Sequence, residues 1–112
     1  MTLVYRVTVR GRFSGLSDSQ RSWLKAKQAE HDVFVSSFTE EGSLSYEPAV
    51  EFFSFRCEVR FPTSGGEAEA CVSAIASAER FLTVLQLPHT ALRAAAMDMS
   101  AMVNSRTSLS DP

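Results

Sequence analysis

The sequence predicts a single α+β domain in which a four-stranded antiparallel sheet carries two helices on one face. Residues 3–13 and 51–61 alternate apolar and polar side chains, the period of a strand whose two faces meet different surroundings. Residues 67–85 instead place apolar side chains three and four positions apart, the period of an amphipathic helix. With a first helix, a hairpin and a last strand near residues 90–99, these segments give the order βαββαβ.

The length and charge of the chain limit its class. A chain of 112 residues has room for one hydrophobic core, so we expect one domain over residues 1–100 and a flexible tail over residues 101–112. The formal charge of −2 argues against general affinity for nucleic acid or for an anionic membrane surface. The sequence has no apolar run of the roughly 18 residues that a membrane-spanning helix needs, and its first residues lack the hydrophobic h-region of a signal peptide. The sequence therefore predicts a cytoplasmic protein.

The long strand over residues 51–61 predicts what both sheet faces carry. Its odd-numbered residues are expected in the core: Phe53, Phe55, Cys57, Val59 and Phe61. Its even-numbered residues point the other way: Phe52, Ser54, Arg56, Glu58 and Arg60. In the first strand Gly11 falls on the apolar side, where local backbone relief is favoured over a bulge or space for a helix. Cys57 and Cys71 fall on core faces, so packing is favoured over a disulfide or redox role.

The first helix and the hairpin follow from local signals. Ser17 with Gln20 three positions later fits a capping box, and the helix is expected to end near residues 31–32. Its apolar stripe is thin, and Trp23 is interpreted as a packing anchor more readily than as a ligand platform. A turn signal then precedes alternating residues 43–46, which predict a short strand paired with the long central one.

The second helix and the last strand complete the order. Ser64 with Glu67 predicts another capping box, and the helix is expected to stop just before Pro88. Residues 90–99 are rich enough in alanine for a helix to compete, but the order of elements favours a strand. In that strand Asp98 is expected on the helix-facing side.

The uncovered sheet face concentrates positive charge. Six of the nine arginines are expected there: Arg6, Arg10, Arg12, Arg56, Arg60 and Arg93. Guanidinium groups suit carboxylate, phosphate or enolate oxygens as well as cross-strand ion pairs. Three interpretations therefore stay open: a solvated face with ordinary ion pairs, the interface of a homodimer, and a site for an anionic ligand.

Candidates for acid–base chemistry are few. His31 lies between Glu30 and Asp32 at a helix end, where the helix dipole and a carboxylate would favour its charged form. It is either a proton-transfer group or a helix cap. Asp98 is either a costly unpaired carboxylate on the helix side or a solvated group beyond the sheet edge. The candidate catalytic residues are thus His31, Asp32 and Asp98, and neither a metal-ligand spacing nor a hydrolase motif is present.

The candidate ligand contacts combine aromatic surface with arginine. They are Trp23, Phe38, Tyr46, Phe55, Arg10 and Arg56. The expected pocket lies between the helices and the sheet, lined by an aromatic inner face that includes Phe13, Phe38, Phe53, Phe55 and Phe61.

Several segments carry a resemblance. They are YRVTVRGRFSGL, EHDV, FTEEGSLSYEP, FFSFR and AAMDMSAM. Together they resemble a family of short actinobacterial proteins of unknown function, several of which lie beside natural-product biosynthesis genes. That resemblance covers nearly the whole chain and brings no assigned activity and no catalytic residues.

The predicted architecture is also similar to ferredoxin-like domains of the dimeric α+β barrel group. These include cofactor-free monooxygenases and cyclases that act on aromatic polyketides. The leading hypothesis is accordingly an enzyme without a cofactor, of the cyclase, isomerase or oxygenase type, acting on a hydrophobic, oxygenated, polyketide-like metabolite. The alternative is a non-catalytic dimeric module that binds a metabolite or supports an assembly, with the homodimer formed through the open sheet face. A DNA-binding regulator is the third hypothesis.

Overall fold

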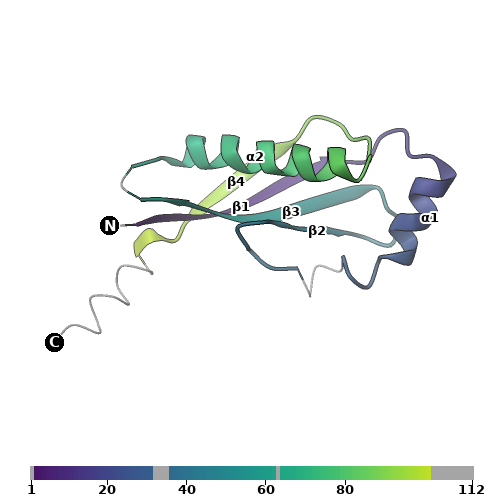
Figure 1. Cartoon of the computed structure of the whole chain (residues 1–112), viewed down its shortest axis with the longest axis horizontal. Coiled ribbons are helices and arrows are strands. Elements are labelled where there is room, and N and C mark those ends of the chain that lie inside the picture. Colours follow the sequence, from purple (N-terminus) through teal and green to yellow (C-terminus); the bar gives the residue numbers. More distant parts are fainter. Residues whose placement is uncertain (1, 32–35, 63, 102–112) are drawn as a thin grey trace.

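The structure, a computed structural model, describes residues 2–31, 36–62 and 64–101. Its elements are β1 (Leu3–Arg12), α1 (Asp18–Ala26), β2 (Ser43–Tyr46), β3 (Phe52–Phe61), α2 (Glu67–Val84) and β4 (Arg93–Asp98). The strands form one antiparallel sheet in the order β2-β3-β1-β4 (Figure 1). The βαββαβ order and the strand within residues 90–99 are confirmed. Residues 102–112 of the predicted tail lie outside the described residues, as does Asp32.

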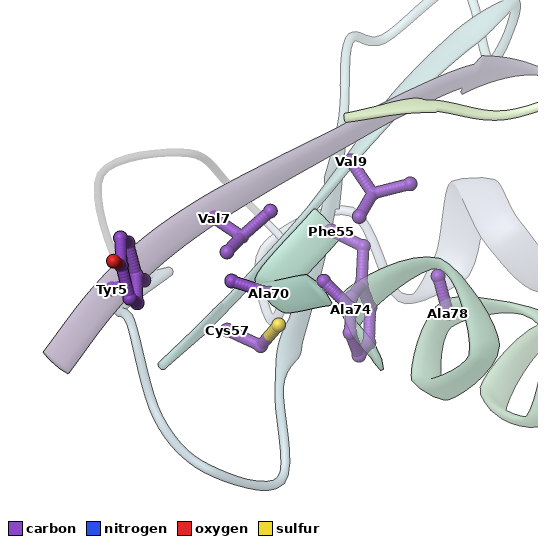
Figure 2. Packing of buried hydrophobic residues seen from close by; sticks show 8 residues of the cluster. All are labelled: Tyr5, Val7, Val9, Phe55, Cys57, Ala70, Ala74 and Ala78. Carbon is purple, nitrogen blue, oxygen red and sulfur yellow. The ribbon is translucent and has the colours of Figure 1, made fainter. Parts of the chain in front are cut away.

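The main core lies between α2 and one face of the sheet (Figures 1 and 2). It is built from β1, β3 and α2 by Tyr5, Val7, Val9, Phe55, Cys57, Ala70, Ala74 and Ala78. The three alanines stand four residues apart, so the helix approaches the sheet closely along one stripe. Both cysteines are free thiols, and Cys57 belongs to this core, where burial raises its pKa. This agrees with the packing interpretation.

The prediction that both helices cover one face is wrong for α1. Figure 1 shows α2 along the sheet and α1 at one end of it. Leu24 is the only buried residue of α1, so one side chain joins it to a second cluster at this end. The predicted capping box is confirmed, since Gln20 N donates to Ser17 Oγ at 3.1 Å. The helix ends at Ala26, earlier than expected, and a series of turns continues to His31.

Two further predictions from local signals need correction. The N-cap of α2 is Gly66, not Ser64, and Gly66 N donates to Glu69 Oε1 at 3.3 Å. At Gly11, an added Cβ would lie 2.6 Å from Phe53 Cζ and 2.8 Å from Leu92 Cδ2. Gly11 therefore leaves room for core side chains, and backbone relief is not its main role.

The two ends of the described backbone meet at the start of β1. Met99 N donates to the Val4 carbonyl oxygen at 2.7 Å, and Val4 N donates to Ser100 Oγ at 2.9 Å. Val4 is buried, although its side chain points to the face opposite α2. Neither of the described helices has the length and apolar character needed to cross a membrane.

Candidate functional site

The face of the sheet opposite α2 is organised in rows that the strand register fixes. One row crosses all four strands and contains Arg93, Arg10, Ser54 and Ser45. The next row contains Ala95, Thr8, Arg56 and Ser43, and a third contains Met97, Arg6 and Glu58. Arg12 lies opposite Phe52, and Arg60 opposite Val4. The register therefore confirms that all six predicted arginines share this open face.

A wide groove follows β1 and β4 on the open face. Its volume is about 1090 Å³, and its floor and walls include Arg6, Arg10, Arg12, Arg93, Phe52 and Met97. The titratable side chains of this described lining are all arginines. Phe52 is 55% exposed and Met97 is 63% exposed, so the groove also offers apolar surface. The groove lies outside the core, on the side opposite the one where the substrate pocket was expected.

Two of the arginines at the margins of the face have carboxylate partners. Arg12 Nη2 lies 3.3 Å from Glu51 Oε1. Arg60 Nε lies 2.8 Å from Glu58 Oε2 and 3.8 Å from Glu40 Oε1. The Arg12–Glu51 and Arg60–Glu40 pairs are largely exposed, so each contributes about 1 kcal/mol or less, whereas the Glu58 side chain is only 15% exposed. The solvated interpretation of the face describes these two arginines well.

The other four arginines of the open face differ. Among the described residues, no carboxylate lies within 4.0 Å of Arg6, Arg10, Arg56 or Arg93. Arg10 and Arg93 are moreover register partners on neighbouring strands. Like charges in directly opposite positions of an antiparallel pair destabilise the sheet. The sheet thus places two arginines in directly opposite positions, without a carboxylate partner among the described residues.

Phe38 lies on the open face and not on the inner one, which corrects the prediction. The guanidinium carbons of Arg6 and Arg56 lie 5.6 Å and 5.4 Å from the centre of its ring. Both contacts are within the range of cation–π attraction. Arg56 Nε is buried without a hydrogen-bond partner in the described structure. Phe38 thus holds two of the positive groups in place at one end of the groove.

A second groove, of about 610 Å³, continues toward β2 from the first. The two grooves share Arg10, Gly11 and Phe52. The polar lining of the second includes Gln28, Ser45 and Ser54. Ser45 is buried at 3% exposure, and Ser54 beside it is half-buried.

His31 is held between α1 and β2 by hydrogen bonds. Its Nδ1 lies 2.9 Å from the Tyr46 hydroxyl, which itself donates to the Leu24 carbonyl. Because the hydroxyl proton is used on Leu24, Nδ1 of His31 is the donor in this pair. The His31 carbonyl also accepts from Tyr46 N at 3.2 Å, which closes this end of the outer edge of β2.

The pKa of His31 differs from the sequence-based expectation, in which the charged imidazolium is favoured. Burial lowers the pKa of His31, and the raising effect of Glu30 is smaller. Burial likewise raises the pKa of Tyr46 to about 12. The pair is therefore neutral near pH 7, and its hydrogen bonds fasten α1 to the sheet.

Asp98 lies opposite Tyr5, on the helix-facing side as predicted. Its side chain is exposed, and hydrogen bonding from the Ser100 side chain and then from Ser100 N, which lies 2.8 Å from Oδ1, lowers the pKa of the carboxyl. Asp98 and His31 are not brought together. Tyr5 is six residues from Gly11, the position on β1 that corresponds to the His31–Tyr46 end, so about 20 Å of strand separates the two groups.

The predicted ligand contacts divide among three places. Phe38, Arg10 and Arg56 lie on the open face, and Tyr46 lines the smaller groove. Trp23 is 39% exposed, and its ring centre lies 6.2 Å from that of His31. Phe55 is fully buried in the main core, away from both grooves. Within the described residues, no group of three or more His, Cys, Asp or Glu could hold a metal ion.

Several residues of the grooves were not among the sequence candidates, and four of them matter for the site. They are Phe52, Ser54, Ser45 and Arg93. Phe52 carried a signal, since it is a large apolar residue on the polar side of its strand. Ser45 and Ser54 carried none, because their proximity to Arg10 depends on the pairing of three strands.

Fold and grooves together define a small α+β protein with one helix-covered sheet face and one open, arginine-rich face. The chain belongs to a family of unknown function (DUF6204), whose model matches residues 1–109. No curated protein and no solved structure matches the chain.

Proposed function

We propose that the protein binds a small organic anion with an apolar body in the larger groove of the open face. The observation that carries this proposal is the pair Arg10 and Arg93, which are neighbours without a carboxylate partner in the described structure. An anion bound between the two side chains would accept hydrogen bonds from both guanidinium groups and offset their repulsion. Bidentate hydrogen bonds from guanidinium groups to carboxylate or phosphate are among the stronger polar contacts in proteins.

The apolar part of the ligand would lie on the surfaces beside this pair. Phe52 and Met97 are exposed on either side of the row that contains Arg10 and Arg93. A groove with several apolar walls and a few convergent polar groups is the usual form of a small-molecule site. The proposal therefore names an aromatic or aliphatic acid, and not a free inorganic ion.

A matched set of variants tests this proposal with 2-naphthoate as the probe. Arg10→Ala and Arg93→Ala should each weaken binding by about tenfold or more, because a charge-assisted hydrogen bond is worth roughly 1.5–3 kcal/mol. The control is Arg80→Ala, since Arg80 is exposed on α2 and bonds only to Ser77 in the described structure. Calorimetric or NMR titration gives the affinities. Equal affinity in Arg10→Ala and Arg80→Ala, or equally tight binding of neutral 2-naphthalenemethanol, would refute the proposal.

The cofactor-independent cyclase, isomerase or oxygenase for a polyketide-like metabolite is the second candidate. Guanidinium groups can stabilise an enolate-like oxygen, which favours such chemistry in the groove. The larger groove has no imidazole or carboxylate in its described lining, so a proton-transfer group must come from outside it. Glu47 lines the smaller groove itself, and the sequence candidate His31 lies one hydrogen bond behind it, on Tyr46 of the same lining. Turnover of a polyketide-like substrate that survives His31→Gln would remove this role.

We propose that ligand binding promotes a homodimer. In this dimer the open sheet faces of two copies would pack together into an α+β barrel. Two such faces brought together would oppose their arginines, which repel unless anions lie between them. Exposed Phe52 and Met97 would supply the apolar contacts. Sedimentation should then show a larger dimer fraction with saturating 2-naphthoate than without it. A dimer fraction that the ligand leaves unchanged would contradict this arrangement.

A further inference from the structure

We infer that the ligand site crosses the whole sheet and selects an acid that carries a hydroxyl group at its far end. The acidic group lies at Arg10 and Arg93, and the hydroxyl lies between Ser54 and Ser45 in the smaller groove. This inference rests on the proposed function, because the arginine pair anchors the ligand.

The geometry comes from a single row of register partners. Arg93, Arg10, Ser54 and Ser45 come from β4, β1, β3 and β2, and they all point to the open face. Neighbouring strands lie about 4.8 Å apart, so the row places its polar groups at regular intervals across the sheet. The two grooves meet at Arg10 and Phe52, so a ligand can extend along the row without leaving a hollow surface.

The aromatic surface also continues across the junction. Phe52 lines both grooves and is 55% exposed, so it can contact a ligand on either side of Arg10. A flat ring system lying along the row would cover Phe52 while its substituents reach the two polar ends. The extended shape of the combined groove therefore fits a ligand of more than one ring better than a compact anion.

The polar groups of the smaller groove specify a hydroxyl. Among the described residues, no side-chain hydrogen bond involves the Ser45 or Ser54 hydroxyl, and neither oxygen belongs to the buried polar atoms without a partner. Gln28 Nε2 donates to the Tyr46 carbonyl at 2.8 Å, which fixes the amide orientation and leaves Gln28 Oε1 buried without a donor. Because that oxygen is buried, a ligand hydroxyl is expected to accept from one of the two serine hydroxyls and to donate to the other. A methyl or halogen substituent can do neither.

Two probes that differ by one group test this inference. The wild-type protein should bind 6-hydroxy-2-naphthoate about fivefold more tightly than 2-naphthoate, the effect of roughly one net hydrogen bond. In Ser45→Ala/Ser54→Ala the ratio of the two affinities should fall to about one. Ser54→Ala alone should lower the ratio and serves as the second variant, because Ser45 is buried and Ser54 is half-buried. Ser73→Ala, an exposed position on α2, should leave the ratio unchanged.

The outcomes separate this inference from the proposed function. If both probes bind through Arg10 and the hydroxyl gives no advantage, the inference fails and the proposed function stands. If the advantage persists in the double variant, the hydroxyl binds elsewhere and the inference also fails. If neither probe binds to the wild-type protein, the proposed function fails, and the inference with it.

Discussion

Gly42→Ala is expected to be the most destabilising single-methyl addition in the sheet region. Gly42 lies in the turn before β2 with a φ of +90°, a conformation that L side chains rarely adopt. An added Cβ would also overlap three atoms of the Phe55 ring. Phe55 is fully buried under Phe81, so its ring cannot move away without disturbing the core.

The expected loss in the free energy of unfolding of Gly42→Ala is the sum of two separate costs. A non-glycine residue held at positive φ costs about 1–3 kcal/mol. Inserting a methyl group into a filled core costs about 1–3 kcal/mol more. The total is a large part of the roughly 5–15 kcal/mol that stabilises a typical domain, so part of the protein should be unfolded at moderate temperature.

Two other glycines separate these costs experimentally. Gly15 has a φ of +76° with no atom within 4 Å of an added Cβ, so Gly15→Ala carries the backbone cost alone. Gly11 does not have a positive φ and contacts Phe53, so Gly11→Ala carries the packing cost alone. Urea unfolding followed by circular dichroism gives the three free energies. A Gly42→Ala variant no less stable than Gly15→Ala would refute the reasoning.

Three further predictions concern the α1 attachment and the open face. Tyr46→Phe should lower the free energy of unfolding by about 1–3 kcal/mol, because buried partners on His31 and Leu24 lose their hydrogen bonds; an unchanged urea midpoint would contradict this. Burial lowers the pKa of His31 from 6.5. The contribution of the neutral imidazole to the free energy of unfolding is therefore complete above pH about 6.5 and is lost as the pH falls through the lowered pKa. Thermal unfolding of His31→Gln should accordingly depend less on pH between 7.5 and about 5 than that of the wild type, and parallel pH profiles would exclude the imidazole as the cause. Arg93→Glu should raise stability by about 0.2–1 kcal/mol in low salt by pairing with Arg10 while abolishing 2-naphthoate binding, and a loss of stability would argue against repulsion between the two arginines.

The sequence predicts the sheet well because its signal is local. Alternation in residues 3–13 and 51–61 assigns each side chain to a face, and the buried odd-numbered residues Phe53 and Phe55 confirm the assignment. The same alternation places the six arginines on one face before any pairing is known. A strand period of two therefore predicts the character of the open face as well as the core.

The site needs information that local patterns do not hold. The approach of Arg10 to Arg93 and of Ser54 to Ser45 depends on the register of pairs between strands that are distant in the sequence. Phe38 lies outside any regular element, so no period assigns its face. The lowered pKa of His31 likewise depends on burial by tertiary packing, whereas its sequence neighbours favour the charged form.

The meeting of Val4 with Met99 and Ser100 has a consequence for engineering. Because the first and last parts of the domain touch, a short linker can join them with little change to the sheet, and the chain can be reopened elsewhere. Gly15 is a suitable opening point, since it lies in an exposed connection with free space around it. A circular permutant of this kind would present α1 at its new N-terminus and leave the rows of the open face intact.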